Sequence, residues 1–190
     1  MSPHTVGNTL GAVLIGSGFA AVLTGVVATQ AVYYFQHYQD DKPSGKLMVA
    51  VVWFLDILHT IMVFVSDWLW LIDHFGDAGA SGWIPWSLGV TVILTAVVTI
   101  IVHAFFVFRI YGLSRGNWFV VSPILILAAI RLGLASASCA NMLKYGNFAK
   151  FVDNAAWMFT MGLVTSSVLD VVTTSCLLWY LDNARTGFAG

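Results

Sequence analysis

Ionisable side chains stand at three places inside long hydrophobic stretches of this chain, where chemistry would need them. The stretch 46–72 carries Asp56 and His59 three residues apart, so both lie on one face of a helix. Arg131 lies at the centre of another stretch, and Asp170 lies within a third. Ionisable groups inside a membrane are costly, face other helices and mark ion or proton sites. We therefore expect a buried charged cluster formed by Asp56, His59, Arg131 and Asp170.

The predicted cluster holds more acid than base. At about 1.5 Å per residue, the four side chains lie about 15–20 Å from the cytoplasmic ends of their helices. An arginine at this depth needs a partner, so we expect Arg131 to pair with Asp170, Asp56 or both. Two carboxylates against one guanidinium leave one negative charge in excess, which could hold a proton or a cation. The alternative is a polar lock, in which the same contacts only fix the packing of the helices.

Other polar side chains lie in the same stretches without forming a catalytic motif. Asp67 lies near the outer end of its stretch, where water could reach it, and His103 is expected to be satisfied by its surroundings. Threonines spaced by one turn can bond the carbonyl of the preceding turn. These secondary polar positions are Asp67, Thr95, Thr99, His103, Ser166 and Thr173.

The sequence offers little for an enzyme. An intramembrane zinc hydrolase would want about three ligands around one cavity, whereas His59 and His103 lie at different depths. The sequence has no H-E-x-x-H, G-x-S-x-G or Walker motif, and no lysine lies deep in a stretch to anchor a Schiff base. We expect no catalytic residue, no metal and no cofactor, and a lipid-modifying activity is the one enzymatic alternative.

The composition is typical of a membrane protein. The 190 residues are 59% hydrophobic and 9% charged, and the mean hydropathy is +0.86. Soluble domains carry about 25% charged residues. A formal net charge of −1 gives no basic field, so nucleic acid is not an expected partner. The expected surroundings are a lipid bilayer, either the plasma membrane or an endomembrane.

Five hydrophobic stretches are long enough to cross about 30 Å of hydrocarbon. They predict an all-α, polytopic transmembrane helix bundle in a single domain over 1–190, without a soluble domain. The segments 37–45, 73–85, 109–117 and 144–154 are predicted loops. Five basic residues fall on one side and two on the other, which predicts an outside N-terminus; these are Lys42, Lys46, Arg109, Arg115 and Arg185 against Lys144 and Lys150. The predicted spans are about 10–35, 46–72, 86–108, 118–142 and 156–181.

Small residues recur at every fourth position in the first and fourth spans. Such ridges let another helix approach closely, which suggests a homo-oligomer or a helical partner. The first ridge is Ala12, Gly16, Ala20, Thr24 and Ala28, and the second is Ala129, Gly133, Ala137 and Asn141.

Several sequence segments carry a resemblance to a known family. They include LIGSGFAAVLTGVVATQAVYYF, LMVAVVWFLDILHTIMV, IRLGLA and LDVVTTSCLLWYL, and the matching positions are Asp56, His59, Arg109, Arg131, Asp170, Arg185 and Gly187. The chain resembles an uncharacterised family of multi-pass membrane proteins of mushroom-forming (basidiomycete) fungi, a domain-of-unknown-function family. The resemblance implies a receptor-like bundle of seven spans, of which this chain would be the N-terminal five-span part. It departs at His103, where the family pattern has Gln.

Three functions remain open from the sequence. The leading expectation is a receptor-like or sensor-type membrane protein whose unknown ligand binds between the helices. A proton- or cation-coupled transporter is the first alternative, because it would use the excess carboxylate and His59. A structural or accessory membrane protein is the second alternative. A dry and saturated contact set around Arg131 would favour the polar lock.

Overall fold

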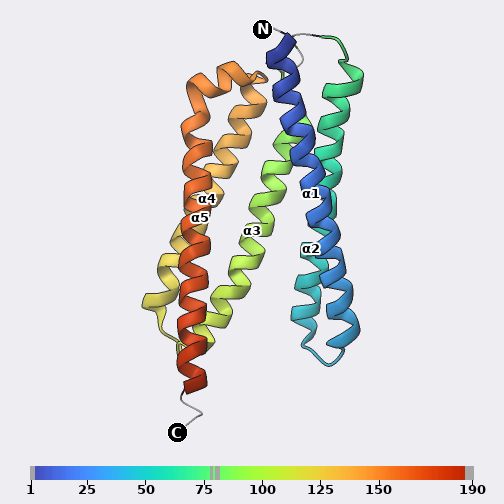
Figure 1. The fold of residues 1–190 in the computed structure, drawn as a ribbon. Coiled ribbons are helices and arrows are strands. Elements are labelled where there is room, and N and C mark those ends of the chain that lie inside the picture. Colours follow the sequence, from blue (N-terminus) through green and yellow to red (C-terminus); the bar gives the residue numbers. More distant parts are fainter. Residues whose placement is uncertain (1–2, 78, 80–81, 187–190) are drawn as a thin grey trace. The chain divides into compact units, whose positions relative to one another are not determined.

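The computed structural model is helical (Figure 1) and describes residues 3–77, 79 and 82–186, with side chains over 10–77, 79 and 82–183. Five helices within the described residues are long and apolar enough to cross a membrane. The prediction of an all-α, multi-pass membrane protein is therefore confirmed. In chain order the elements are α1 (Pro3–His37), α2 (Pro43–Trp68), the short π-helical turn η1 (Leu69–Asp73), α3 (Trp86–Leu113), α4 (Trp118–Tyr145) and α5 (Phe148–Thr186).

The prediction of a loop over 144–154 is wrong. Helix α4 runs to Tyr145 and α5 begins at Phe148. Gly146 ends α4 with a φ of +57°, a left-handed conformation that glycine adopts without strain. The side-chain oxygen of Asn147 then accepts the Ala149 N–H at 2.9 Å and so caps α5.

The segment 109–117 was also predicted to be a loop, and part of it is helical. Helix α3 continues to Leu113, so Arg109 lies on an exposed helical turn. The side-chain oxygen of Asn117 accepts the Phe119 N–H at 3.0 Å at the start of α4. Charged residues beyond a hydrophobic span therefore need not form a loop.

The described chain divides into two compact units. The first consists of Met1–Thr95 and Cys139–Asn154, and the second of Ala96–Ser138 and Ala155–Gly190. Helices α3, α4 and α5 each contribute residues to both units. The single domain over 1–190 and the outside N-terminus stay predictions. The side chain of Arg185 and residue Gly187 lie outside the described part.

In the first unit, α1 and α2 lie side by side (Figure 1). Their contact includes a hydrogen bond of 2.7 Å between the hydroxyls of Thr24 and Thr60. A second buried hydroxyl pair, Ser66 and Ser87, joins α2 to α3 at 2.7 Å. Each hydroxyl pair satisfies polar groups that would otherwise be costly to bury.

The first unit also ties the segment before α3 to the connection between α4 and α5. The Ile84 N–H donates to the Gly146 carbonyl at 3.1 Å, and Trp83 and Asn147 form an isolated antiparallel bridge. The Trp70 indole N–H donates to the Trp83 carbonyl at 3.1 Å. These bonds hold η1, the segment before α3 and the start of α5 together.

The core of the second unit is built from α3, α4 and α5. Its buried side chains are large and aliphatic, as expected for tightly packed helices. They are Val107, Ile110, Val121, Ile124 and Leu169.

The predicted ridges of small residues are open in part. A Cβ atom added to Gly16 or Gly133 would meet nothing within 4 Å, and Ala12 and Ala129 are exposed. The other members of both ridges are half-buried, and Thr24 contacts Thr60. A homo-oligomer or a helical partner on these ridges stays a prediction.

Candidate functional site

Three ionisable side chains form a charged group in the second unit, one each from α3, α4 and α5. We call His103, Arg131 and Asp170 the charged group. The imidazole Nε2 of His103 lies 3.3 Å from a carboxylate oxygen of Asp170. His103 and Arg131 are 5% and 8% exposed, whereas the Asp170 side chain is 64% exposed. Asp170 also acts electrostatically on the Arg131 guanidinium.

The second nitrogen of His103 indicates the tautomer of its ring. Its Nδ1 lies 2.8 Å from the carbonyl oxygen of Thr99, one turn back. A carbonyl can only accept, so we assign a proton to Nδ1. A neutral ring would then point the lone pair of Nε2 at the Asp170 carboxylate, and two acceptors would face each other. A proton between Nε2 and the carboxylate removes this repulsion, whichever atom carries it.

The position of Asp170 differs from the arrangement expected from the sequence. We expected Arg131 to pair with Asp170, Asp56 or both, and assigned no charged partner to His103. Asp170 is near enough to act on Arg131, but within the described residues its ion pair is with His103. The side-chain Nε of Arg131 is buried, and no described residue is its hydrogen-bond partner.

Two hydroxyls of the second unit are also buried without a partner in the described part of the chain. They are the side-chain oxygens of Ser138 on α4 and Thr173 on α5. With the Nε of Arg131, they are the buried side-chain polar atoms of this unit that have no partner among the described residues.

The remaining secondary positions of the second unit and its border have ordinary roles. The Thr95 hydroxyl donates to the Thr91 carbonyl at 2.9 Å, which confirms the expected bond to the preceding turn. The Thr99 carbonyl faces the ring of His103. Ser166 is half-buried on α5.

Asp56 and His59 belong to the first unit, on α2. Both are half-buried, and Asp56 acts electrostatically on His59. One carboxylate oxygen of Asp56 is buried without a hydrogen-bond partner among the described residues. Because Arg131 and Asp170 belong to the other unit, the meeting of all four side chains stays a prediction.

Asp67 differs from expectation, because it is buried rather than wet. It is 5% exposed, and the hydroxyl of Ser17 on α1 is its hydrogen-bond partner. Its second carboxyl oxygen has no partner in the described part of the chain. Helix α2 continues past Asp67 into η1, so this residue lies inside the helical packing and not at its wet end.

No metal centre is formed by the described residues, since none of their His, Cys, Asp and Glu side chains gather in threes. Comparisons of this chain with models of protein families, with curated proteins and with solved structures find no match. The resemblance to the fungal membrane-protein family stays a prediction.

Proposed function

We propose that this integral membrane protein is a receptor-like sensor, and that its charged group responds to the gain or loss of one proton. The observation that supports the proposal is the 3.3 Å contact between His103 and Asp170, in which Nδ1 of the ring is already committed to Thr99. The contact is favourable when one proton lies between the two side chains.

The charged group has two arrangements of different charge. With the proton, Arg131 (+1), His103 (+1) and Asp170 (−1) sum to +1. Without it, the sum is zero, and Arg131 is the remaining cationic neighbour of the carboxylate. The unpartnered Nε of Arg131 can donate to that carboxylate. Loss of the proton would therefore move the contact of α5 from α3 to α4, a local change that can shift a packed helix.

A proton-coupled transporter is the second candidate. The observation that favours it is the 64% exposure of the Asp170 side chain, because the helices of its own unit do not enclose this carboxylate. A transporter would also need the carboxylate to face each side of the membrane in turn. A purely structural role has less support, because the buried polar atoms of Arg131, Ser138 and Thr173 lack partners within the described residues.

The sensor is tested by following α5 while the pH is changed. Cys176 is a half-buried free cysteine on α5 that packs against the core of the second unit. A spin label on Cys176, in a Cys139→Ala background, reports the packing of α5 in reconstituted vesicles. We expect the spectrum to change with pH, and His103→Gln and Asp170→Asn to abolish the change.

His37 provides the matched control. Its Nδ1 lies 3.0 Å from the carbonyl of Tyr33, as in His103, but it is exposed and no described carboxylate forms an ion pair with it. His37→Gln should leave the spectral change intact. A spectrum that ignores pH, or a change that survives in His103→Gln, contradicts the proposal. Proton flux into dye-loaded vesicles that disappears in Asp170→Asn would favour the transporter.

A further inference from the structure

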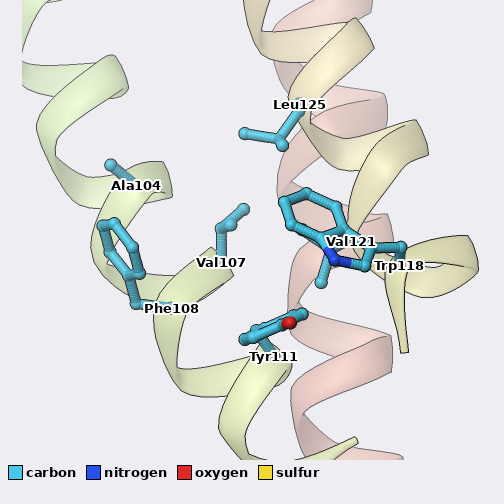
Figure 2. Close-up of a pocket in the computed structure, with 7 residues that line it drawn as sticks. All are labelled: Ala104, Val107, Phe108, Tyr111, Trp118, Val121 and Leu125. Carbon is cyan, nitrogen blue, oxygen red and sulfur yellow. The ribbon is translucent and has the colours of Figure 1, made fainter. Parts of the chain in front are cut away.

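An apolar pocket lies in the second unit between α3 and α4, and no member of the charged group lines it (Figure 2). Its volume is about 290 Å³, and four side chains of α3 and three of α4 line it. Val107 and Val121, 7% and 1% exposed, line the buried side of the pocket. Phe108 and Trp118, 76% and 61% exposed, line its open side. No polar surface contributes to its lining.

One end of the pocket is formed by two amphipathic rings. Tyr111 and Trp118 lie with their ring centroids 5.2 Å apart, tilted by 57° (Figure 2). Both stand at the ends of their membrane-spanning helices, where Tyr and Trp lie at headgroup depth. The pocket therefore begins at the membrane interface and extends along the span.

The same end carries positive charge. Arg109 and Arg115 are exposed, and residues 109–117 contain no acid. Arg115 has a φ of +54° and Gly116 a φ of +84°, so the chain turns sharply here. A Cβ on Gly116 would lie 3.5 Å from the Tyr111 hydroxyl. Tyr111 thus links the apolar pocket to the basic turn.

We propose that this pocket holds an acyl chain of an anionic phospholipid, with the phosphate at Arg115. Small-molecule sites have volumes of about 300–1,000 Å³, so the pocket suits part of one chain and not a whole lipid. Basic residues at the end of a span attract anionic headgroups, and the apolar lining selects hydrocarbon. The site is independent of the proposed proton response.

Lipids with brominated acyl chains test the site, because bromine quenches tryptophan on contact. The protein is reconstituted in phosphatidylcholine vesicles with equal shares of brominated phosphatidylglycerol or brominated phosphatidylcholine. The quenching that is lost in Trp118→Phe is the contribution of Trp118. We expect the Trp118 contribution to be roughly fivefold greater with brominated phosphatidylglycerol than with brominated phosphatidylcholine, because one basic residue near the membrane gives an anionic lipid about this advantage.

Two variants separate the headgroup from the chain. Arg115→Asn keeps a residue that tolerates the left-handed conformation, and it should reduce the anionic preference to the phosphatidylcholine level. Lys150→Ala, an exposed cation on α5 in the first unit, is the matched control and should change nothing. Equal quenching by both lipids, or an unchanged preference in Arg115→Asn, overturns the headgroup contact.

Ala104→Phe fills the pocket and should remove the Trp118 quenching by both lipids, whereas Ile130→Phe, on another exposed face of α4, should not. Persistent quenching in Ala104→Phe overturns the acyl-chain site. Should this variant fail to fold, Ala104→Leu fills less space and should remove part of the quenching. The Arg115→Asn comparison does not depend on either change.

Discussion

The two units each hold a carboxyl inside a membrane span, in opposite surroundings. Asp67 in the first unit is 5% exposed and has the Ser17 hydroxyl as its partner. Asp170 in the second unit is 64% exposed, forms an ion pair with His103 and acts on Arg131. Burial by itself does not make Asp67 a switch, because no second contact competes for it in the described part of the chain. Asp170 has two neighbours that can be cationic, His103 and Arg131, and the gain or loss of a proton can change which of them it contacts.

The hydroxyls of the two units differ in the same sense. In the first unit, Ser66 and Ser87 bond each other across two helices. In the second unit, Ser138 and Thr173 are buried without partners among the described residues. Satisfied pairs specify one packing, whereas unsatisfied groups leave room for another. The contrast concerns the hydroxyls alone, since buried carboxyl oxygens of Asp56 and Asp67 in the first unit also lack partners among the described residues.

Removing the Asp170 charge should have the largest effect. Asp170→Asn leaves the buried Arg131 without its described acidic neighbour, so the free energy of unfolding should fall by about 2 kcal/mol. This is below the about 3–5 kcal/mol of a fully buried broken pair, because Asp170 is 64% exposed. Unfolding in mixed micelles measures the change, with the exposed Asp153→Asn as control. An unchanged stability would remove the contrast between the units.

The hydroxyls sharpen the comparison. Ser87→Ala removes a buried partner of Ser66 and should lower the free energy of unfolding by about 1 kcal/mol. Ser138→Ala removes a hydroxyl without a described partner, so stability should stay the same or rise. The same micelle titration compares the two alanine variants directly. A greater loss in Ser138→Ala would mean that the second unit is the more specifically bonded one.

Asp67→Asn should act in the opposite direction to Asp170→Asn. A neutral amide is cheaper to bury than a carboxylate, and its NH2 group can donate to the Ser17 oxygen, whose own O–H donates to the Val13 carbonyl at 2.9 Å; the free energy of unfolding should therefore rise by about 0.5–1 kcal/mol. The exposed Asp40→Asn serves as control. A clear loss of stability would show that Asp67 has a cationic partner. Asp67 and Asp170 would then both be stabilised by positive charge.

The smallest effect concerns Asp41, which lies between α1 and α2. The Tyr34 hydroxyl donates to its carboxylate at 2.5 Å and, with the Lys42 backbone N–H, lowers the pKa of Asp41. Because the pKa of Asp41 is lower in the folded state, this carboxylate stabilises the fold at pH values above its ordinary pKa of about 3.9. The stabilisation is lost as the pH falls through the pKa of the folded state. Tyr34→Phe should weaken the loss of stability in acid, measured by unfolding at several pH values. Tyr33→Phe should leave it unchanged.

The number of spans could be predicted from the sequence because hydrophobic length is a local property. The start of α5 could not, because it depends on the Asn147 cap, and the polar composition of 144–154 resembles a loop. Small errors at helix ends shift every depth that is counted from them.

The fate of single polar side chains was harder to predict than the spans. Thr95 bonds its preceding turn as expected, because that bond needs only its own helix. The burial of Asp67 depends on Ser17, fifty residues earlier in the chain. Hydropathy describes how one helix meets lipid, and it contains no information on which neighbouring helix covers a given carboxyl.

The connection between α4 and α5 has a practical consequence for protein engineering. It consists of Gly146 and Asn147, and both are bonded to the segment before α3. An affinity tag or fluorescent protein inserted here would break the backbone bonds between this connection and the segment before α3. Fusion partners for imaging therefore belong elsewhere, and the exposed tip around Asp40 is a better insertion point.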